Sequence, residues 1–385
     1  MNGGTQSAMR WAWAEIDLDA IRHNVEYLRS VVAPAAVWAV VKADGYGHGA
    51  VDVARAAMSA GAEGLCVALV PEGIELRRAG IDAPILLLSE QPPEAASHII
   101  EHRLTPTVYT RAFLDALARE RPNGLPVHLK IDTGMQRVGA HTHAVGSLVA
   151  AVEERAPALR LAGISTHLAV ADEPDNDYTA LQLKRLDRAL EHAPHVPLVH
   201  AANSAGALAH PDARRSFVRA GIAVYGISPG SGVDHLCGDL RPALELRSRV
   251  SYVKQVRAGS RVSYGLRHTF SHDTTVATVP IGYADGVPRR LWSTGGEVLI
   301  KGRRRPIVGV VTMDQLMVDC GDPSESDGEV GVGDDVVLIG EQDGPNGPQR
   351  IRAEDWAARL DTIGYEIVCG ISGRVPRVPR RSIDT

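Results

Sequence analysis

Apolar and polar positions alternate in blocks along the first 226 residues of the chain. Short apolar runs are separated by longer stretches in which apolar residues recur at helical spacing. Most of the runs are apolar throughout rather than alternating, which is typical of strands buried on both faces of a parallel sheet. The eight runs are Val37–Val41, Gly64–Leu69, Pro84–Leu88, Thr105–Tyr109, Val127–Ile131, Leu161–His167, Leu198–Ala202 and Phe217–Val224.

The stretches between these runs predict crossover helices. A first helix is expected where Asp19 can cap a segment with Ile21, Val25 and Leu28 on one face. Eight strand–helix units in about 200 residues predict a (β/α)8 TIM barrel, although a doubly wound open sheet is the alternative if one or two runs are miscounted. The other helical stretches are Gly49–Ala60, Pro71–Ala79, Ala112–Arg119 and Thr179–His192.

The pattern changes after residue 240, where apolar runs are separated by turn-rich pieces, which predicts a mainly β C-terminal domain. One helix is expected at about Ala353 to Thr362, the acidic Asp322–Asp335 stretch as a surface loop, and Arg303–Arg305 at a hairpin tip. The domains are then a disordered tail (1–10), a barrel domain (11–240) and a β domain (241–385). The predicted β runs are Leu244–Val256, Thr274–Ile281, Val298–Ile300, Pro306–Val311, Gln315–Val318 and Asp335–Ile339.

Composition and charge narrow the class of protein. The 385 residues include 41 Lys and Arg against 46 Asp and Glu, a net charge of −5, so no basic nucleic-acid surface is expected. No apolar run approaches the roughly 18 residues that span a bilayer, and residues 1–10 lack the apolar stretch of a secretory signal. The four cysteines have no C-x-x-C spacing and suggest neither zinc nor a disulfide framework. We therefore expect a cytoplasmic protein with a small-molecule substrate, no metal, and neither nucleic acid nor membrane as partner.

Lys42 is the first candidate for chemistry. It ends an apolar run and is followed by a segment with three glycines, Tyr46 and His48. On a barrel, catalytic groups lie at the carboxyl ends of strands. A partly desolvated lysine there has a lowered pKa and is a plausible Schiff-base amine, while the glycines allow close approach of the backbone to a ligand.

The segment Val41–Gly49 resembles the pyridoxal-phosphate attachment signature of the alanine racemase family. Seven further segments, spread in order over nearly the whole chain, are similar to other motifs of this family. They are Leu129–Gly139, Ser165–Leu168, Ala202–Ser204, Arg219–Ile222, Val262–Gly265, Thr312–Gln315 and Ile363–Glu366.

The resemblance implies a pyridoxal-phosphate enzyme that interconverts L-alanine and D-alanine. Lys42 is then the cofactor attachment site and the base on one face of the substrate, and Tyr264 is the base on the other. His167 is expected beside Tyr264 and the cofactor ring, because a tyrosine needs a cationic or hydrogen-bonding neighbour to act as a base at neutral pH. Arg219 is expected at the pyridine nitrogen, where a permanent cation leaves the nitrogen unprotonated and disfavours transamination.

The remaining site residues also follow from the resemblance. Arg137 is expected to bind the substrate carboxylate, with Lys130 carbamylated and positioning it, because an uncompensated buried ammonium is costly. Ser204 is expected as the N-cap of a short helix that meets the phosphate. The other cofactor residues are Tyr46, Asn203, Gly221, Ile222 and Tyr365, the substrate residues Met313 and Asp314, and the residues of the access passage Asp172, Tyr283 and Arg289.

Members of this family have an N-terminal barrel and a C-terminal β domain, and act as head-to-tail homodimers. Tyr264 and Met313 are therefore expected to reach the other subunit's cofactor, and the strand at about Trp11 to Asp17 to pair with the C-terminal domain. In a bacterium the product, D-alanine, would supply peptidoglycan. The alternatives are a racemase of serine or broader specificity, a decarboxylase of the same fold type, and a non-catalytic pyridoxal-phosphate carrier.

Overall fold

The computed structural model describes residues 10–322 and 330–380, so residues 1–9 of the predicted tail and 323–329 of the predicted loop lie outside the described residues. The chain divides into two compact units: a barrel unit from Asp19 to Arg241, and a β unit that combines the segment up to Leu18 with the segment from Pro242 onward. In the described ranges, no helix is long and apolar enough to cross a membrane.

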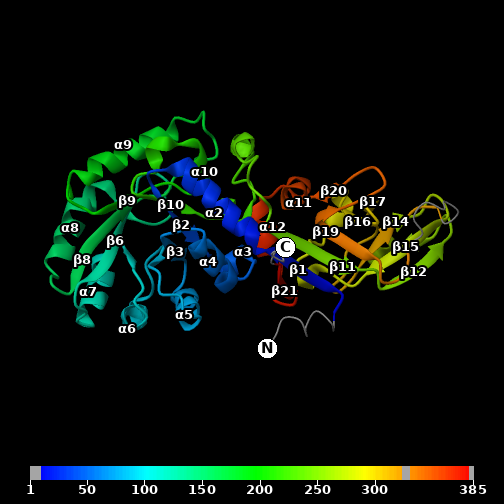
Figure 1. Cartoon of the computed structure of the whole chain (residues 1–385), viewed down its shortest axis with the longest axis horizontal. Coiled ribbons are helices and arrows are strands. Elements are labelled where there is room, and N and C mark those ends of the chain that lie inside the picture. Colours follow the sequence, from blue (N-terminus) through cyan, green and yellow to red (C-terminus); the bar gives the residue numbers. More distant parts are fainter. Residues whose placement is uncertain (1–9, 323–329, 381–385) are drawn as a thin grey trace. The chain divides into compact units, whose positions relative to one another are not determined.

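The barrel unit is built on eight parallel strands, in agreement with the prediction (Figure 1). Strand β10 pairs in parallel with β2, an isolated bridge from Leu86 to Thr105 links β4 to β5, and Ser216 N donates to Val199 O between β9 and β10. The sheet is therefore closed, which excludes the open-sheet alternative. The strands are β2 (Ala36–Val40), β3 (Gly64–Val67), β4 (Ile85–Leu87), β5 (Thr107–Val108), β6 (Leu125–Asp132), β8 (Leu159–Ser165), β9 (Leu198–His200) and β10 (Phe217–Ala220), and the short β7 (Ala140–His141) pairs with β6.

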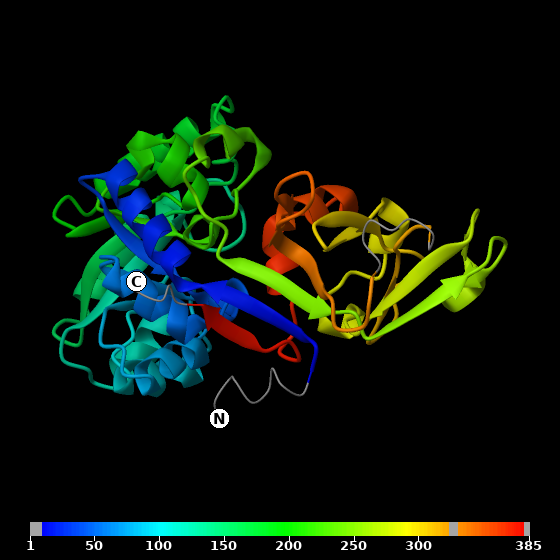
Figure 2. The ribbon, with the colours of Figure 1, turned by 45° about the vertical axis from the view of Figure 1, so that its right-hand side comes forward.

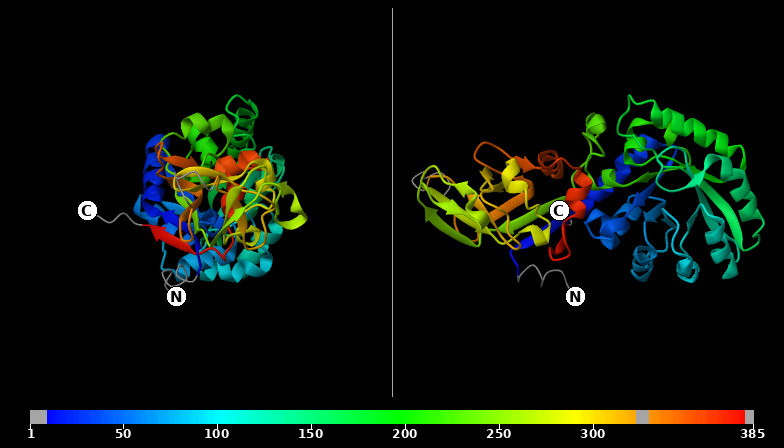
Figure 3. Two further views of the ribbon diagram at one scale, coloured as in Figure 1. Left: turned by 90° about the vertical axis from the view of Figure 1, so that its right-hand side faces the viewer. Right: turned by 180° about the vertical axis from the view of Figure 1, so that it is seen from behind.

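Helices follow the barrel strands and cover their outer side (Figures 1 and 3). Asp19 lies within the first turn of its helix instead of capping it, and forms an ion pair with Arg22. The last apolar run, predicted as one strand to Val224, ends as a strand at Ala220 and continues as a 3-10 helix. The helices are α2 (Leu18–Val32), α4 (Ala50–Ser59), α5 (Val70–Arg78), α6 (Ala96–Glu101), α7 (Arg111–Arg119), α8 (Val145–Glu153), α9 (Tyr178–Leu190) and α10 (Ser204–Ala209).

The β unit contains a large sheet in the order β17-β16-β19-β11-β1-β21, with β20 paired to β19. Figure 2 shows β1, in blue, beside β21, in red, and these two strands are parallel whereas β1 and β11 are antiparallel. A smaller sheet has the order β12-β15-β18, and β13 pairs with β14. The strands are β1 (Ala12–Asp17), β11 (Leu244–Arg249), β12 (Tyr252–Val256), β13 (Arg261–Val262), β14 (His268–Thr269), β15 (Thr274–Val279), β16 (Glu297–Ile300), β17 (Arg303–Pro306), β18 (Leu316–Asp319), β19 (Asp335–Gln342), β20 (Gln349–Ile351) and β21 (Arg377–Arg380), with helices α11 (Ala353–Leu360) and α12 (Gly364–Cys369).

One expectation for the β unit was wrong. Arg303–Arg305 belongs to edge strand β17, and the hairpin tip is Lys301–Gly302, both with positive φ. Charged side chains protect an exposed sheet edge from pairing with other chains, which explains a strand that looks like a loop by composition. Arg10, the last residue of the predicted tail, is held in place because it forms an ion pair with the buried Asp285.

Candidate active site

Lys42 lies two residues after the end of β2, at the carboxyl end of the barrel, where a TIM barrel places its reactive groups. The residues that follow it form a left-handed turn in which Ala43, Asp44 and Tyr46 have φ between 51° and 53°. Left-handed backbone costs roughly 1–2 kcal/mol for each non-glycine residue. Two carboxylates stabilise the turn: Glu72 accepts from Ala43 N (2.7 Å), and Asp44 accepts from the first amide of α4, Ala50 N (2.9 Å).

The turn brings Tyr46 against the segment that follows β10. A Cβ at Gly221 would lie 2.6 Å from the Tyr46 hydroxyl, so the hydroxyl occupies the space that this glycine leaves open. Ser204 Oγ accepts hydrogen bonds from the backbone amides of Gly221 (2.9 Å) and Ala223 (3.2 Å). These residues, with Ile222 between the two amides, form a compact polar cluster at the ends of β9 and β10.

The cap of α10 is one residue earlier than predicted. Asn203 is the N-cap, with its side-chain oxygen accepting from Gly206 N (2.9 Å), and Ser204 is the first helical residue. Asn and Ser are almost equally good caps, so the sequence pattern did not separate them. The shift frees the Ser204 hydroxyl to bind the segment after β10.

Arg219 projects from β10 and is 6% exposed. Its guanidinium donates to the backbone oxygens of Thr166 (2.8 Å) and Ala201 (2.9 Å), and approaches His200 Nδ1 (2.6 Å) and His167 Nδ1 (3.4 Å). Within the described residues, no carboxylate forms an ion pair with it. Burial lowers its pKa to about 10, which still leaves a cation at neutral pH.

Two buried histidines behind Arg219 were missed by the sequence analysis. His200 Nε2 lies 2.9 Å from Nδ1 of His128, and both rings are almost completely buried. Because arginine can only donate, His200 Nδ1 must accept, so His200 Nε2 carries the proton that it shares with His128. Burial, with Arg219 next, lowers the pKa of His128 to about 4 and that of His200 well below 6.5, so both remain neutral. Both had been counted only as members of apolar strand runs.

His167 and Lys130 are also held in unusual protonation states. Burial lowers the pKa of His167 well below 6.5, helped by Arg219, Lys130, Arg137 and Lys42. His167 is therefore a neutral hydrogen-bonding group and not the cation that the sequence left as one option. Burial likewise lowers the pKa of Lys130, whose Nζ donates to Leu88 O (3.1 Å), from 10.5 to about 7.

Arg137 extends from the loop after β6 and shares a recess with Lys130 and His167. Asp132 shapes this loop, because its Oδ1 accepts from the backbone amides of Gly134 (2.9 Å) and Gln136 (3.1 Å). The guanidinium is exposed, so its donors are available to a ligand. The structure thus gathers Lys42, Lys130, His167, Arg137 and Arg219 at one end of the barrel, an arrangement suited to anionic ligands.

The other candidate base belongs to the β unit. Tyr264 is 71% exposed and follows Ser263, which has a φ of 63° and donates from Oγ to Val310 O (2.6 Å). Met313 is 51% exposed, and its carbonyl accepts from Ala284 N (3.0 Å). Both side chains are large and point to the surface of the unit that carries them.

The remaining predicted residues divide between the two units. Asp314 is engaged by Arg374 (2.6 Å), so its carboxylate already has a cationic partner. Tyr365 lies near the start of α12 and is partly buried. Of the predicted passage residues, Asp172 packs against Gly230 and Gly232 in the barrel unit, while Tyr283 and Arg289 are exposed in the β unit.

The residues at the barrel end fit pyridoxal phosphate. Lys42 supplies an amine, the Ser204 hydroxyl and the Gly221 amide lie in a polar cluster beside the Tyr46 hydroxyl, and Arg219 is a buried cation that forms no ion pair with a carboxylate among residues 10–322 and 330–380. The N-terminal model "Alanine racemase, N-terminal domain" matches residues 16–229, and "Alanine racemase, C-terminal domain" matches residues 243–379. The chain belongs to the alanine racemase family. Members of this family are pyridoxal-phosphate-dependent isomerases.

Individual relatives agree along almost the whole chain. The alanine racemase of Symbiobacterium thermophilum is 49% identical over 96% of this chain and 97% of its own, and alanine racemase 1 of Bacillus subtilis is 42% identical over 97% and 94%. Among solved structures, the alanine racemase of Streptomyces coelicolor superposes with a TM-score of 0.90 at 38% identity, over 99% of this chain and 100% of its own. The Bacillus anthracis enzyme, solved with bound L-Ala-P, gives a TM-score of 0.88 at 39% identity over 97% and 96%.

Proposed function

We propose that this protein interconverts L-alanine and D-alanine with pyridoxal phosphate, and that in a bacterium its product supplies peptidoglycan. The observation that carries the proposal is the group of Lys42, Arg137, Lys130 and Arg219 around neutral His167 at one end of the barrel. This arrangement provides an amine for the cofactor and cationic partners for anionic groups. In the part of the chain that the structure describes, Arg219 binds histidines and backbone oxygens and forms no ion pair with a carboxylate. Membership of the alanine racemase family supports it over the decarboxylase and carrier alternatives.

Lys42 would hold the cofactor covalently, and Tyr46, Ser204, Gly221 and Ile222 its phosphate, joined by Asn203 and Tyr365. When bound, pyridoxal phosphate withdraws electrons from the substrate's Cα, so that the proton there becomes acidic. Once the substrate's amino group has displaced it from the cofactor, the free Lys42 amine would take or return this proton on one face. A group on the opposite face must do the reverse for the configuration to invert.

Arg219 would favour this reaction over transamination. A guanidinium with a pKa of about 10 stays charged, and it can donate to the pyridine nitrogen but not accept a proton from it. Arg219 would thereby keep the nitrogen unprotonated and negative charge close to the substrate's Cα. Protonation at the wrong carbon, the first step of transamination, would then be disfavoured.

Arg137 would bind the substrate carboxylate, with Met313 contributing its backbone. Lys130 is proposed to be carbamylated, since a pKa of about 7 leaves much of the amine unprotonated and able to react with carbon dioxide. The resulting anion would orient the Arg137 guanidinium. A protein incubated with 13C-bicarbonate should show a carbamate carbon signal by NMR that is lost in Lys130→Arg; the same signal in both proteins would refute the modification.

Tyr264 is proposed as the base on the opposite face, supplied by the other subunit of a homodimer. Its exposure at 71% is expected for a side chain that a partner chain covers. Because His167 Nδ1 faces the donor Arg219, its Nε2 carries the proton and can donate to the Tyr264 oxygen. Asp172, Tyr283 and Arg289 would line the passage to this shared site.

Mixing two inactive variants tests the shared site. In a dimer with sites made from two chains, one site of a Lys42→Ala/Tyr264→Phe heterodimer is intact and the other carries both changes. After co-refolding equal amounts, activity should return to roughly a quarter of that of the wild type, because half the dimers are mixed and each has one intact site. Activity that stays at the level of the separate variants would exclude sharing.

The substrate is tested by chiral analysis of products. Purified protein with added cofactor should convert L-alanine to a racemic mixture, with a kcat/KM well above that for L-serine. A higher kcat/KM for serine would replace alanine racemisation by the broader alternative, since one hydroxyl changes binding by only about 1–3 kcal/mol. Absence of any D-amino acid would refute the proposal.

A further inference from the structure

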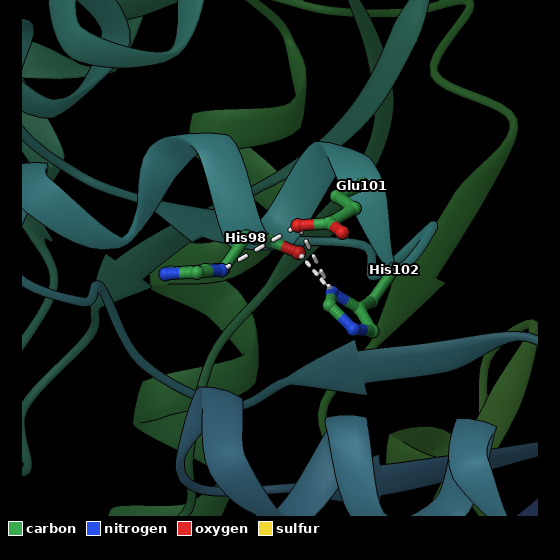
Figure 4. Close-up of side chains that lie close together, drawn as sticks. All are labelled: His98, Glu101 and His102. Carbon is green, nitrogen blue, oxygen red and sulfur yellow. Dashed lines mark hydrogen bonds and ion pairs between the residues drawn. The ribbon is translucent and has the colours of Figure 1, made fainter.

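A second cluster of ligand side chains lies outside the candidate active site, at the end of α6 in the barrel unit. Figure 4 shows His98, Glu101 and His102 gathered on one side of this short helix, with the glutamate between the two rings. His98 Nδ1 lies 3.6 Å and His102 Nδ1 3.9 Å from the same carboxylate oxygen, Oε2 of Glu101. Nothing in the proposed reaction uses these residues.

The spacing of the three residues explains why they meet. Positions i, i+3 and i+4 lie on one face of a helix, so His98 is one turn away from both Glu101 and His102. His102 is the residue that closes the helix, and its side chain is 20% exposed, whereas those of the other two are more than half exposed. The cluster is therefore reached from solvent but has one ligand already fixed against the protein.

The distances fit a metal ion. Two ligands of one tetrahedral zinc ion, with bonds of about 2.0–2.2 Å, lie roughly 3.3–3.5 Å apart. The two observed nitrogen–oxygen separations exceed this by only a few tenths of an ångström, and the three ligand atoms lie within 4.8 Å of one another. A small rotation of exposed side chains would close the difference.

We propose that His98, Glu101 and His102 form a surface site for a divalent transition ion, with Zn²⁺ or Cu²⁺ as the preferred class. Two imidazoles and one carboxylate are a ligand set that these ions favour over Mg²⁺ and Ca²⁺, which prefer oxygen ligands. Water would complete the coordination on the exposed side. The scattered cysteines gave no hint of this site, which needs none of them.

Binding would change one contact. His102 Nδ1 lies 3.1 Å from the backbone oxygen of His98, and this hydrogen bond is lost when the nitrogen lone pair turns to the metal. Nε2 then carries the ring proton. The bound ion would link His98 to Glu101 and His102 across the last turn of α6, so metal binding should also raise the stability of the protein.

The test uses the holoenzyme without any histidine tag. Isothermal titration with Zn²⁺ should reveal one binding site. His102→Gln and His98→Gln should each lower its affinity for zinc at least tenfold, and Glu101→Gln should lower it by a smaller factor. His141 and His143, exposed rings stacked 5.3 Å apart elsewhere on the barrel unit, provide the control. The double variant His141→Gln/His143→Gln should bind zinc as the wild type does.

Two further readouts make the result decisive. At equal zinc concentration, Zn²⁺ should raise the Tm of the wild type more than that of His102→Gln. The EPR spectrum of bound Cu²⁺ should show coupling to nitrogen in the wild type, and this coupling should weaken in both histidine variants. Equal zinc affinity in the wild type and in His102→Gln would overturn the proposal. Displacement of Zn²⁺ by equimolar Mg²⁺ would also overturn it, because it would indicate a site made of carboxylates alone. Absence of zinc binding at micromolar concentrations would overturn it too.

Discussion

Arg219 and His200 are joined by a 2.6 Å contact between Nη1 and Nδ1, and this pair fixes the chemistry of the barrel end. The contact requires a neutral His200, whose Nδ1 accepts a hydrogen bond from Arg219 and whose Nε2 donates one to His128 Nδ1. Arg219 thus keeps its charge although no carboxylate among the described residues forms an ion pair with it. The cation is oriented by imidazole and backbone oxygens.

Replacing this cation should change the products. Arg219→Glu presents a carboxylate that can keep the pyridine nitrogen protonated, so the cofactor would take up the amino group of L-alanine and release up to one equivalent of pyruvate per bound cofactor, while racemase kcat falls by about 100-fold or more. Arg219→Lys keeps a cation and should lose activity without gaining pyruvate. A lactate-dehydrogenase-coupled assay measures the side product, and equal pyruvate yields from the two variants would contradict this role.

Lys130 predicts a pH-dependent stability. Its pKa is about 7 in the folded protein and 10.5 when unfolded, so the unfolded chain binds more protons between these values and stability rises with pH there. Below pH 7 the penalty for the buried ammonium is fully present. In carbon-dioxide-free buffer, Lys130→Met should therefore have a higher Tm than the wild type at pH 6, by roughly 5 °C, and the difference should shrink toward pH 10.

An exposed lysine supplies the control for this measurement. Lys184 lies on the surface of α9, so the Tm difference between Lys184→Met and the wild type should not vary with pH. If the Tm difference between Lys130→Met and the wild type were also independent of pH, the buried ammonium would not be the cause of that difference.

The cluster around Tyr46 predicts a loss of cofactor affinity in Gly221→Ala. The added methyl group would lie 2.6 Å from the Tyr46 hydroxyl and would displace it from the segment after β10. The dissociation constant of pyridoxal phosphate, measured by fluorescence titration of the apoenzyme, should rise at least tenfold. Gly238→Ala, where a Cβ meets nothing within 4 Å, should bind the cofactor normally, and equal affinities in the two variants would count against the cluster.

The sequence anticipated the barrel because buried parallel strands are apolar throughout, and each predicted run overlaps a strand. The same rule gave no indication of the contact between His128 and His200, since the sequence of one apolar run does not show which residue of another strand a polar side chain will contact. The N-cap of α10 was predicted at Ser204 instead of Asn203, because adjacent Asn and Ser side chains can both accept from the first amides of a helix. Tyr264 stood out only through its motif; its solvent exposure depends on packing, which a local pattern does not encode.

Removing the Tyr264 hydroxyl should affect kcat far more than removing the hydroxyl of another exposed tyrosine. Tyr264→Phe removes the proposed base and should lower kcat for L-alanine by about 100- to 10,000-fold, with the absorbance of the bound cofactor retained. Tyr252 is 58% exposed in the same unit, and Tyr252→Phe should stay within twofold of the wild type. Similar losses in both variants would indicate a general effect on the β unit.

The most direct test of two-sided proton transfer is proton NMR in deuterium oxide, with chiral analysis of the alanine formed. Starting from L-alanine, the wild type should lose the α-proton signal and yield D-alanine, whereas Tyr264→Phe should be severely slowed in forming the D enantiomer. Starting from D-alanine, the wild type should show the reverse conversion. Exchange of the α-proton in the wild type without inversion would mean that only one base acts, and would contradict the account.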